Sequence, residues 1–280
     1  NQFYHPSNAR VFLEGNINLE QVLLKLHNFF KEYSYREQKN ILKKQEEVCG
    51  GESIIYYNIA EHENEQQKAI LSESFVYGLY DEPEKSMACS ILAEMLCSTA
   101  EDQLKKVILE RGLAENVELG KTDGVLQPYM SLIIRNTSEE KKEEIWELIY
   151  DTLKNVVREG LDKKRIKSII NRMEFNFREQ DYGKMPQGIA HALHALDSWL
   201  YGGNPAQNLQ FDKIFEFLRE KVEQGYFENL IQEVFLENKH HARICMLPSK
   251  TLAKEQTQME RKRLSDLKLS WSIKEEHKII

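Results

Sequence analysis

The chain has 280 residues, of which 41% are hydrophobic, and a net charge of −7 at pH 7. This length is sufficient for one large domain or two small ones. The acidic balance excludes nucleic acid as a general partner. Because no run of eighteen apolar residues occurs, the sequence predicts no membrane-spanning helix. The composition is typical of a globular protein of the cytoplasm, or of an organelle matrix if the source is eukaryotic.

Four cysteines, Cys49, Cys89, Cys97 and Cys245, are scattered along the chain without a CxxC pair. This spacing gives no support to a zinc ribbon or a thioredoxin motif, and it favours a reducing compartment. Cys89 and Cys97 lie within a helical pattern, so we expect their thiols to lie in the core.

The N-terminal part of the chain combines a short apolar run with a helix. Residues 9–15 (ARVFLEG) predict a buried strand. Asn18 is a suitable N-cap for a helix over about 19–33. The polar, charged stretch 34–51 ends in two glycines and indicates a linker.

The middle of the chain alternates between strand and helix patterns. The expected elements are strands at 53–60 and 68–78, helices at 83–97 and 101–111, strands at 115–121 and 125–136, and a helix at 139–158. Gly112 is a suitable C′ residue for the second helix, and Thr122-Asp123-Gly124 predicts a turn between the later strands. Pro128 predicts that its strand is bulged or lies at a sheet edge.

A helix, a break and a second helix follow between Asp162 and Trp199. The break is expected at Asp181-Tyr182-Gly183, and Met185-Pro186-Gln187-Gly188 leads into the second helix. Further helices are expected at 211–223 and 226–237, then a strand at 241–249 and an exposed, charged helix from Thr251. This order predicts an α+β fold, with helices packed on a mostly antiparallel sheet.

The clearest candidate for a metal motif is the segment from His62 to Gln66 (HENEQ), which is one residue short of H-x-x-E-H. In that motif two histidines bind zinc and the glutamate activates a metal-bound water. Here Gln66 replaces the second histidine, and the segment falls in an expected loop. We therefore interpret it as a solvated acidic loop.

Other histidines form two further candidate clusters. His191 and His194 are three residues apart on an expected helix, with Asp197 continuing the same face. They could hold a metal, although their Ala and Leu neighbours favour a core or interface role. His240 and His241, at the start of a strand, are expected to be exposed.

Common catalytic motifs are missing from the sequence. It contains no GxSxG, Walker lysine loop or GxGxxG. Gly50-Gly51 and Gly202-Gly203 are interpreted as linker or turn glycines, and the carboxylate-rich runs 139–147 and 255–276 as charged helix faces. The residues themselves thus point to no catalytic and no metal-binding residue, and they leave any substrate-binding residue unknown.

Several segments, in order along the chain, resemble one protein family. They are Tyr4-His5-Pro6-Ser7-Asn8-Ala9, Glu14-Gly15-Asn16, Leu113-Ala114-Glu115, Asp123-Gly124-Val125-Leu126-Gln127-Pro128, Glu174-Phe175, Phe177-Arg178-Glu179, Pro186-Gln187-Gly188, Trp199-Leu200-Tyr201 with Pro205 and Leu209, Tyr226-Phe227 through Leu230-Ile231, and Asn238-Lys239-His240-His241. They resemble the pitrilysin/insulinase-type zinc metallopeptidases, and the presequence protease and falcilysin branch matches best.

The resemblance implies a parent protein of four homologous α+β domains around a closed chamber, with zinc bound by an H-x-x-E-H motif in the first domain. That motif would lie upstream of this chain, so no catalytic residue is carried over. The implied division is 1–37 as the end of the catalytic domain, 38–51 as a linker, 52–250 as a non-catalytic second domain and 251–280 as the start of a helical hairpin. The chain is thus expected to be an internal fragment.

The implied function is a chamber wall in a zinc metalloendopeptidase that degrades unstructured peptides. The fragment itself would be inactive and would hold no cofactor, whereas the parent would use zinc. Its expected partners are peptides, the missing catalytic domain and the C-terminal half. The alternative is a catalytically inactive relative that acts as a scaffold or assembly subunit. A third hypothesis is a separate metal site at His191 and His194.

Overall fold

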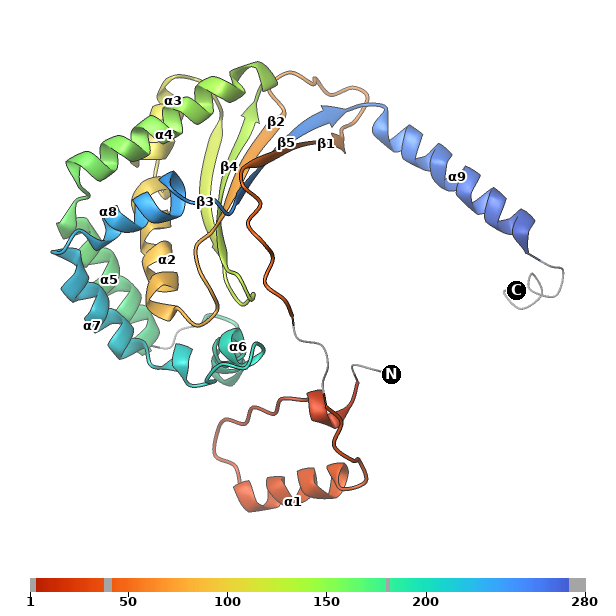
Figure 1. Ribbon diagram of the computed structural model, residues 1–280, viewed down its shortest axis with the longest axis vertical. Helices are drawn as coiled ribbons and strands as arrows, with labels where there is room; N and C mark the ends of the chain where they lie inside the picture. Colours follow the sequence, from red (N-terminus) through yellow and green to blue (C-terminus); the bar gives the residue numbers. More distant parts are fainter. Residues whose placement is uncertain (1–3, 38–41, 180–181, 272–280) are drawn as a thin grey trace.

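One five-stranded sheet, with helices packed on one face, forms the centre of the molecule (Figure 1). The computed structural model describes residues 4–37, 42–179 and 182–271. The strands are β1 (Gly51–Asn58), β2 (Ala69–Val76), β3 (Asn116–Thr122), β4 (Tyr129–Thr137) and β5 (His241–Ser249). Their order is β1-β5-β2-β4-β3, with β1 parallel to β5 and the other neighbouring pairs antiparallel. The expected α+β class is confirmed.

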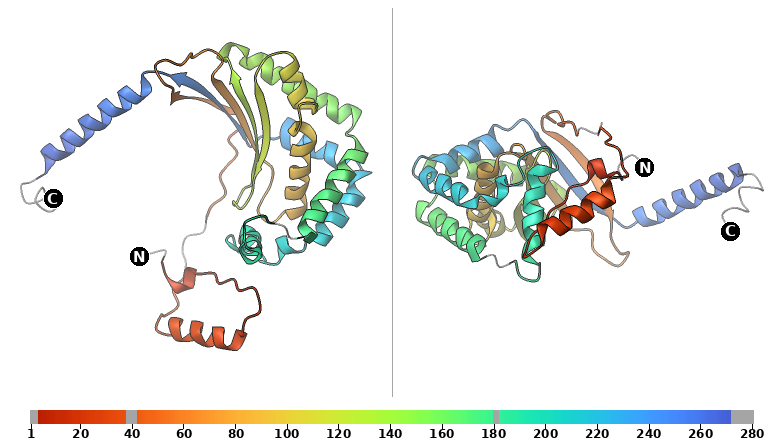
Figure 2. Two further views of the ribbon diagram at one scale, coloured as in Figure 1. Left: turned by 180° about the vertical axis from the view of Figure 1, so that it is seen from behind. Right: turned by 90° about the horizontal axis from the view of Figure 1, so that it is seen from below.

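Helices of the described ranges cover the sheet on one side and leave the other side open (Figure 2). The covering helices are α2 (Pro83–Cys97), α3 (Gln103–Glu110), α4 (Lys142–Glu159), α5 (Lys163–Glu179), α7 (Phe211–Val222) and α8 (Tyr226–Ile231), which continues as a π-helix over Gln232–Leu236. Three others lie outside this layer: α1 (Leu19–Phe30), α6 (Gln187–Trp199) and α9 (Leu252–Ser270). No helix in the described ranges has the length and apolar character needed to cross a bilayer.

Strand β2 shows how the sequence pattern produces the core. Its side chains alternate between buried and half-buried, and the buried set is Ala69, Leu71, Glu73 and Phe75. Successive side chains of a strand point to opposite faces, so this set faces the helical layer. This alternation places an acidic residue, Glu73, inside the core.

The helices bury apolar stripes against the same core. In α4 the buried residues are Ile145, Trp146, Ile149, Leu153 and Val156, which recur at three- and four-residue steps.

Gly112 ends α3 as expected: its φ is +62°, and its N–H donates to the Leu109 carbonyl at 3.0 Å. Cys89 and Cys97 are both buried, which confirms the expected core thiols.

The expected strand at 9–15 is wrong. These residues are irregular in the structure, and Val11 and Leu13 are each 42% exposed. An extended apolar segment becomes a strand only when a neighbouring strand supplies backbone hydrogen bonds, and no β-ladder in the described chain reaches this segment.

The expectation for Pro128 is met only in part, because β4 carries a bulge but not at the proline. Pro128 lies just before β4, and β4 is an interior strand between β2 and β3. Proline therefore removes no hydrogen bond from the ladder here, and its carbonyl accepts the N–H of Tyr77 at 3.1 Å. The irregularity of the β2–β4 pair is at the opposite end, where the register shifts between Ala69 and Ile70 and Asn136 has a φ of +58°.

Candidate functional site

A cavity of about 230 Å³ lies between the β3–β4 hairpin, the N-terminal half of α2, the C-terminal half of α5, and α6 and α7. Its apolar lining includes Met87, Val125, Met173, Phe177, Phe211 and Ile214. Met173 and Phe177 are four residues apart on α5, which places both on the same face of that helix. The helix–break–helix segment that the sequence predicts therefore forms one side of this cavity, since His194 and Asp197 of its second helix also line it.

Polar groups meet at one end of the cavity around Ser86. The Lys121 ammonium donates to the Ser86 hydroxyl at 2.9 Å and forms an ion pair with Asp123 at 2.8 Å. The Tyr77 hydroxyl also donates to Ser86 Oγ, at 3.1 Å. Burial raises the pKa of Tyr77 well above its ordinary value, so this hydroxyl stays neutral. The charge of Lys121 is thus balanced locally.

Asp197 of α6 lines the same cavity beside the tip of the hairpin. The tip approaches α6 so closely that a Cβ on Gly124, whose φ is +68°, would lie 3.0 Å from Asp197 Oδ1. The Tyr201 hydroxyl donates to the Gly124 carbonyl at 2.8 Å. Burial, followed by the charge of Asp197, raises the pKa of Tyr201. The positive φ of Gly124 therefore favours glycine at this turn, and the close approach of Asp197 adds to this preference.

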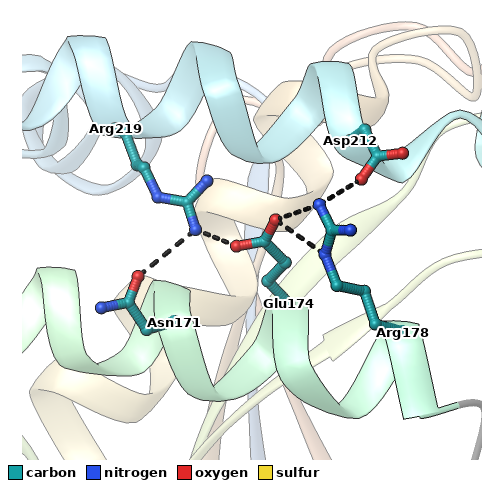
Figure 3. Close-up of polar contacts among 5 residues, drawn as sticks. All are labelled: Asn171, Glu174, Arg178, Asp212 and Arg219. Carbon is teal, nitrogen blue, oxygen red and sulfur yellow. Dashed lines mark hydrogen bonds and ion pairs between the residues drawn. The ribbon is translucent and has the colours of Figure 1, made fainter.

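A polar cluster between α5 and α7 supports the apolar wall of the cavity (Figure 3). Glu174 accepts hydrogen bonds from Arg178 on its own helix, at 2.8 Å from Nη2, and from Arg219 on α7. Arg178 also bridges to Asp212 at 2.7 Å, and Arg219 bonds the Asn171 amide oxygen. Carboxylate–guanidinium contacts of this kind fix both distance and orientation. They hold α5 and α7 together beside Met173 and Phe177.

The segment from His62 to Gln66 lies in a turn between β1 and β2, as expected. The Glu63 carboxylate accepts the Ala60 N–H at 3.0 Å and is paired with Lys68. The Lys68 contact is the largest of the causes that lower the pKa of Glu63. Glu63 therefore stabilises the turn through local contacts, which fits the interpretation of this segment as a solvated loop.

His191 and His194 take different partners. His191 Nδ1 lies 2.8 Å from Glu14 Oε2 of the N-terminal segment, and the ring packs edge-to-face against Tyr182. His194 Nδ1 is 3.9 Å from Asp197 Oδ2, and its ring contacts Phe177. The expected interface role fits His191, because its contact joins α6 to a segment 177 residues away in sequence.

His241 is not exposed as expected. Its ring stacks on Phe75 with centroids 5.7 Å apart, and its Nδ1 lies 2.7 Å from Glu73 Oε1. Tyr150 and Arg243 contact the same oxygen at 2.9 and 3.1 Å. This buried polar cluster was missed by sequence reasoning. The available signal was a glutamate at an inward position of β2, directly opposite Arg243 in the register of β5.

The donor set of the described chain does not fit zinc. No three or more His, Cys, Asp or Glu side chains gather there in a way that could hold a metal ion. Structural and catalytic zinc sites need three or four such ligands. Of the sequence candidates, His191 is paired with Glu14 and Glu63 with Lys68.

Comparison with known proteins identifies the family. The sequence profile of the "Peptidase M16 inactive domain" matches residues 1–173. The chain belongs to the peptidase M16 family. Within that family it is 32% identical over 281 residues to Protein HypA of Clostridium perfringens and 28% identical over 278 residues to Presequence protease 1, chloroplastic/mitochondrial, of Arabidopsis thaliana. The resemblance to the presequence protease branch is thereby confirmed.

The M16 chain is much shorter than these relatives. The alignments cover 100% and 95% of the chain but only 29% and 26% of Protein HypA and Presequence protease 1. Among solved structures, a protease from Helicobacter pylori has the same fold, with a TM-score of 0.59 at 11% identity, covering 84% of this chain and 53% of that one. The match to the inactive-domain profile identifies the chain as a non-catalytic domain of a peptidase family.

Proposed function

We propose that the chain is part of the wall of a closed chamber in a zinc metalloendopeptidase that degrades unstructured peptides. In the proposed parent, an upstream catalytic domain carries the zinc motif and a C-terminal half completes the chamber. Residues 1–37 would end the catalytic domain, 52–250 would form the second domain, and 251–280 would begin the connecting hairpin. The match to an inactive peptidase domain carries this proposal.

The open face of the sheet supports the role of a wall. The strand register places Ile55, Met246 and Ile70 side by side across three strands, on the face away from Leu71 and the helices. Ile55 and the neighbouring Ile244 are about two-fifths exposed. A broad, partly apolar surface of this kind is suited to contact with unfolded chains, whose apolar side chains are accessible.

Strand β1 offers a second contact for an extended peptide. In the described sheet it pairs with β5 on one side and is the terminal strand on the other. Its residues Ile54 and Tyr56 are half or more exposed. An extended peptide can add to such an edge through main-chain hydrogen bonds, which require little sequence specificity.

The test uses the 280-residue chain as purified. We expect it to contain no stoichiometric zinc and to show no chelator-sensitive cleavage of a quenched unstructured peptide. We also expect it to bind that peptide, and to bind less tightly when alternate backbone nitrogens are methylated, because methylation removes the donors needed to add a strand. Fluorescence anisotropy measures the binding.

Two outcomes would overturn the proposal. Stoichiometric zinc together with chelator-sensitive cleavage would mean that the chain holds a catalytic site of its own. A chain that binds no unstructured peptide would instead favour an inactive scaffold or assembly subunit.

A further inference from the structure

The cavity between α6 and the β3–β4 hairpin has the size and lining of an anchor pocket. Its volume of about 230 Å³ exceeds the roughly 150 Å³ of an engineered apolar cavity that binds benzene. Two methionines, Met87 and Met173, line the cavity, and their flexible thioether side chains can adapt to bound groups of different shape. An aromatic or large aliphatic side chain therefore fits this space.

The charges of the lining favour one kind of neighbour for that side chain. Three formally charged side chains line the cavity: Lys121, Asp123 and Asp197. Lys121 and Asp123 neutralise each other at 2.8 Å. The remaining charge belongs to Asp197, whose side chain is one-third exposed and whose Oδ2 lies 3.9 Å from Nδ1 of His194. The lining of the cavity beside Asp197 therefore carries a negative charge.

The surroundings leave Asp197 available to a guest. Its carboxylate lies beside Gly124, which has no side chain to cover it. The hydroxyl of nearby Tyr201 is directed to the Gly124 carbonyl and not to the carboxylate. A partly exposed carboxylate next to an apolar cavity is complementary to an apolar side chain followed or preceded by a basic one.

We propose that this cavity anchors a bulky apolar side chain of an unstructured peptide, with an adjacent Lys or Arg placed at Asp197. The inference rests on the proposed function, because it specifies which peptides the domain binds best. The apolar group packs against Met173, Phe177 and Ile214, and the basic group lies in water beside Asp197. The burial of the apolar side chain supplies most of the affinity, and the exposed charge pair supplies a smaller, salt-sensitive part.

Three fluorescent twelve-residue peptides test this on the whole chain. The first carries one Phe followed by Arg in a Gly/Ser background, the second replaces Phe with Ala, and the third replaces Arg with Glu. We expect the Phe-to-Ala peptide to bind at least about tenfold more weakly. We expect the Arg-to-Glu peptide to bind about three- to tenfold more weakly at low salt, and this difference to shrink in 0.5 M NaCl as charges are screened.

Protein variants test whether the preferences for Phe and for Arg arise at this cavity and at Asp197. Val125→Trp fills the cavity from the hairpin and should remove the preference for Phe over Ala. Leu193→Trp, on α6 but outside the cavity lining, is its matched control. Asp197→Asn should remove the preference for Arg over Glu and retain the preference for Phe, whereas Asp151→Asn on the exposed surface of α4 should change neither. Thermal unfolding confirms that each variant is folded.

The outcomes separate the two proposals. If the peptides bind but neither Phe-to-Ala nor Val125→Trp changes the affinity, the anchor pocket is overturned and the proposed function stands. The anchor pocket is likewise overturned if Val125→Trp does not fold and Asp197→Asn fails to change the Arg-over-Glu preference. If no peptide binds to the unmodified chain, both proposals fail.

Discussion

Glu73 shows how a single residue links the sheet to the helical layer. Its carboxylate is fully buried. One carboxylate oxygen, Oε1, contacts His241 and Arg243 of β5 and accepts a hydrogen bond from Tyr150 of α4. The Arg243 guanidinium in turn lies 4.8 Å from the ring centroid of Trp146, which is close enough for a cation–π contact. A buried charge is tolerated when opposite charge and hydrogen bonds surround it in this way.

We expect Glu73→Gln to lower the free energy of unfolding by about 3 kcal/mol, because it leaves Arg243 with no counter-charge in a largely buried site. Urea-induced unfolding, followed by circular dichroism, measures the change. The matched control is Glu118→Gln, since Glu118 and Arg135 form a half-exposed pair at 3.5 Å. There the expected loss is below about 0.5 kcal/mol. Equal losses in both variants would contradict the role assigned to the buried pair.

At the scale of helices and strands, periodicity carries most of the prediction. Apolar steps of three and four place α4 and α5, and alternation places β2, because these patterns reflect burial on one face. The same pattern at 9–15 fails, since a strand also needs a partner that local sequence does not specify. The order of the strands in the sheet is not predictable from apolar periodicity either, because β5, which comes last in the sequence, lies between β1 and β2.

Helix α3 joins the rest of the layer through its N-cap, Asp102. The Asp102 carboxylate is almost fully buried and forms an ion pair with Arg165 of α5 at 2.6 Å. Burial by itself would raise the pKa of Asp102, but the hydrogen bonds from Arg165 and Thr99 outweigh it and hold the pKa below the ordinary value.

The lowered pKa predicts how the stability contributed by Asp102 depends on pH. A carboxyl with a depressed pKa in the folded state stabilises the fold above its unfolded pKa of about 4 and loses that contribution as pH falls through the folded value. The gap in unfolding free energy between wild type and Asp102→Asn should therefore be constant from pH 7 to 5 and shrink below pH 4. Urea titrations at each pH measure it. In an Arg165→Gln background the shrinkage below pH 4 should be smaller, because the pKa of Asp102 is then less depressed, and a gap independent of pH in the wild-type background would contradict the assignment.

At the scale of the whole molecule, the candidate site depends on segments that are distant in sequence. The cavity combines residues from Tyr77 to Ile214, and its key carboxylate, Asp197, meets a hairpin tip at Gly124. The sequence predicts the turn and both helices around the break, but not their meeting, because packing between helices is set by the complete core. The spacing of the histidines of α6 in the sequence is compatible with metal ligands, whereas in the structure His191 contacts Glu14 of the N-terminal segment.

Apolar surface on α1 and on the open sheet face leads to a prediction of self-association. No residue of α1 is buried, and Leu23 and Leu24 are 53% and 61% exposed. Contiguous exposed apolar surface promotes association in water. We expect the sedimentation coefficient of the chain to rise with concentration. The Leu23→Lys/Leu24→Lys variant should sediment closer to a monomer, because two apolar contacts are replaced by charges. Glu144→Lys, which reverses a charge on the exposed face of α4 and so changes the net charge by the same amount, should leave the association in place. A clean monomer for the unmodified chain at high concentration would show that these surfaces do not bind one another.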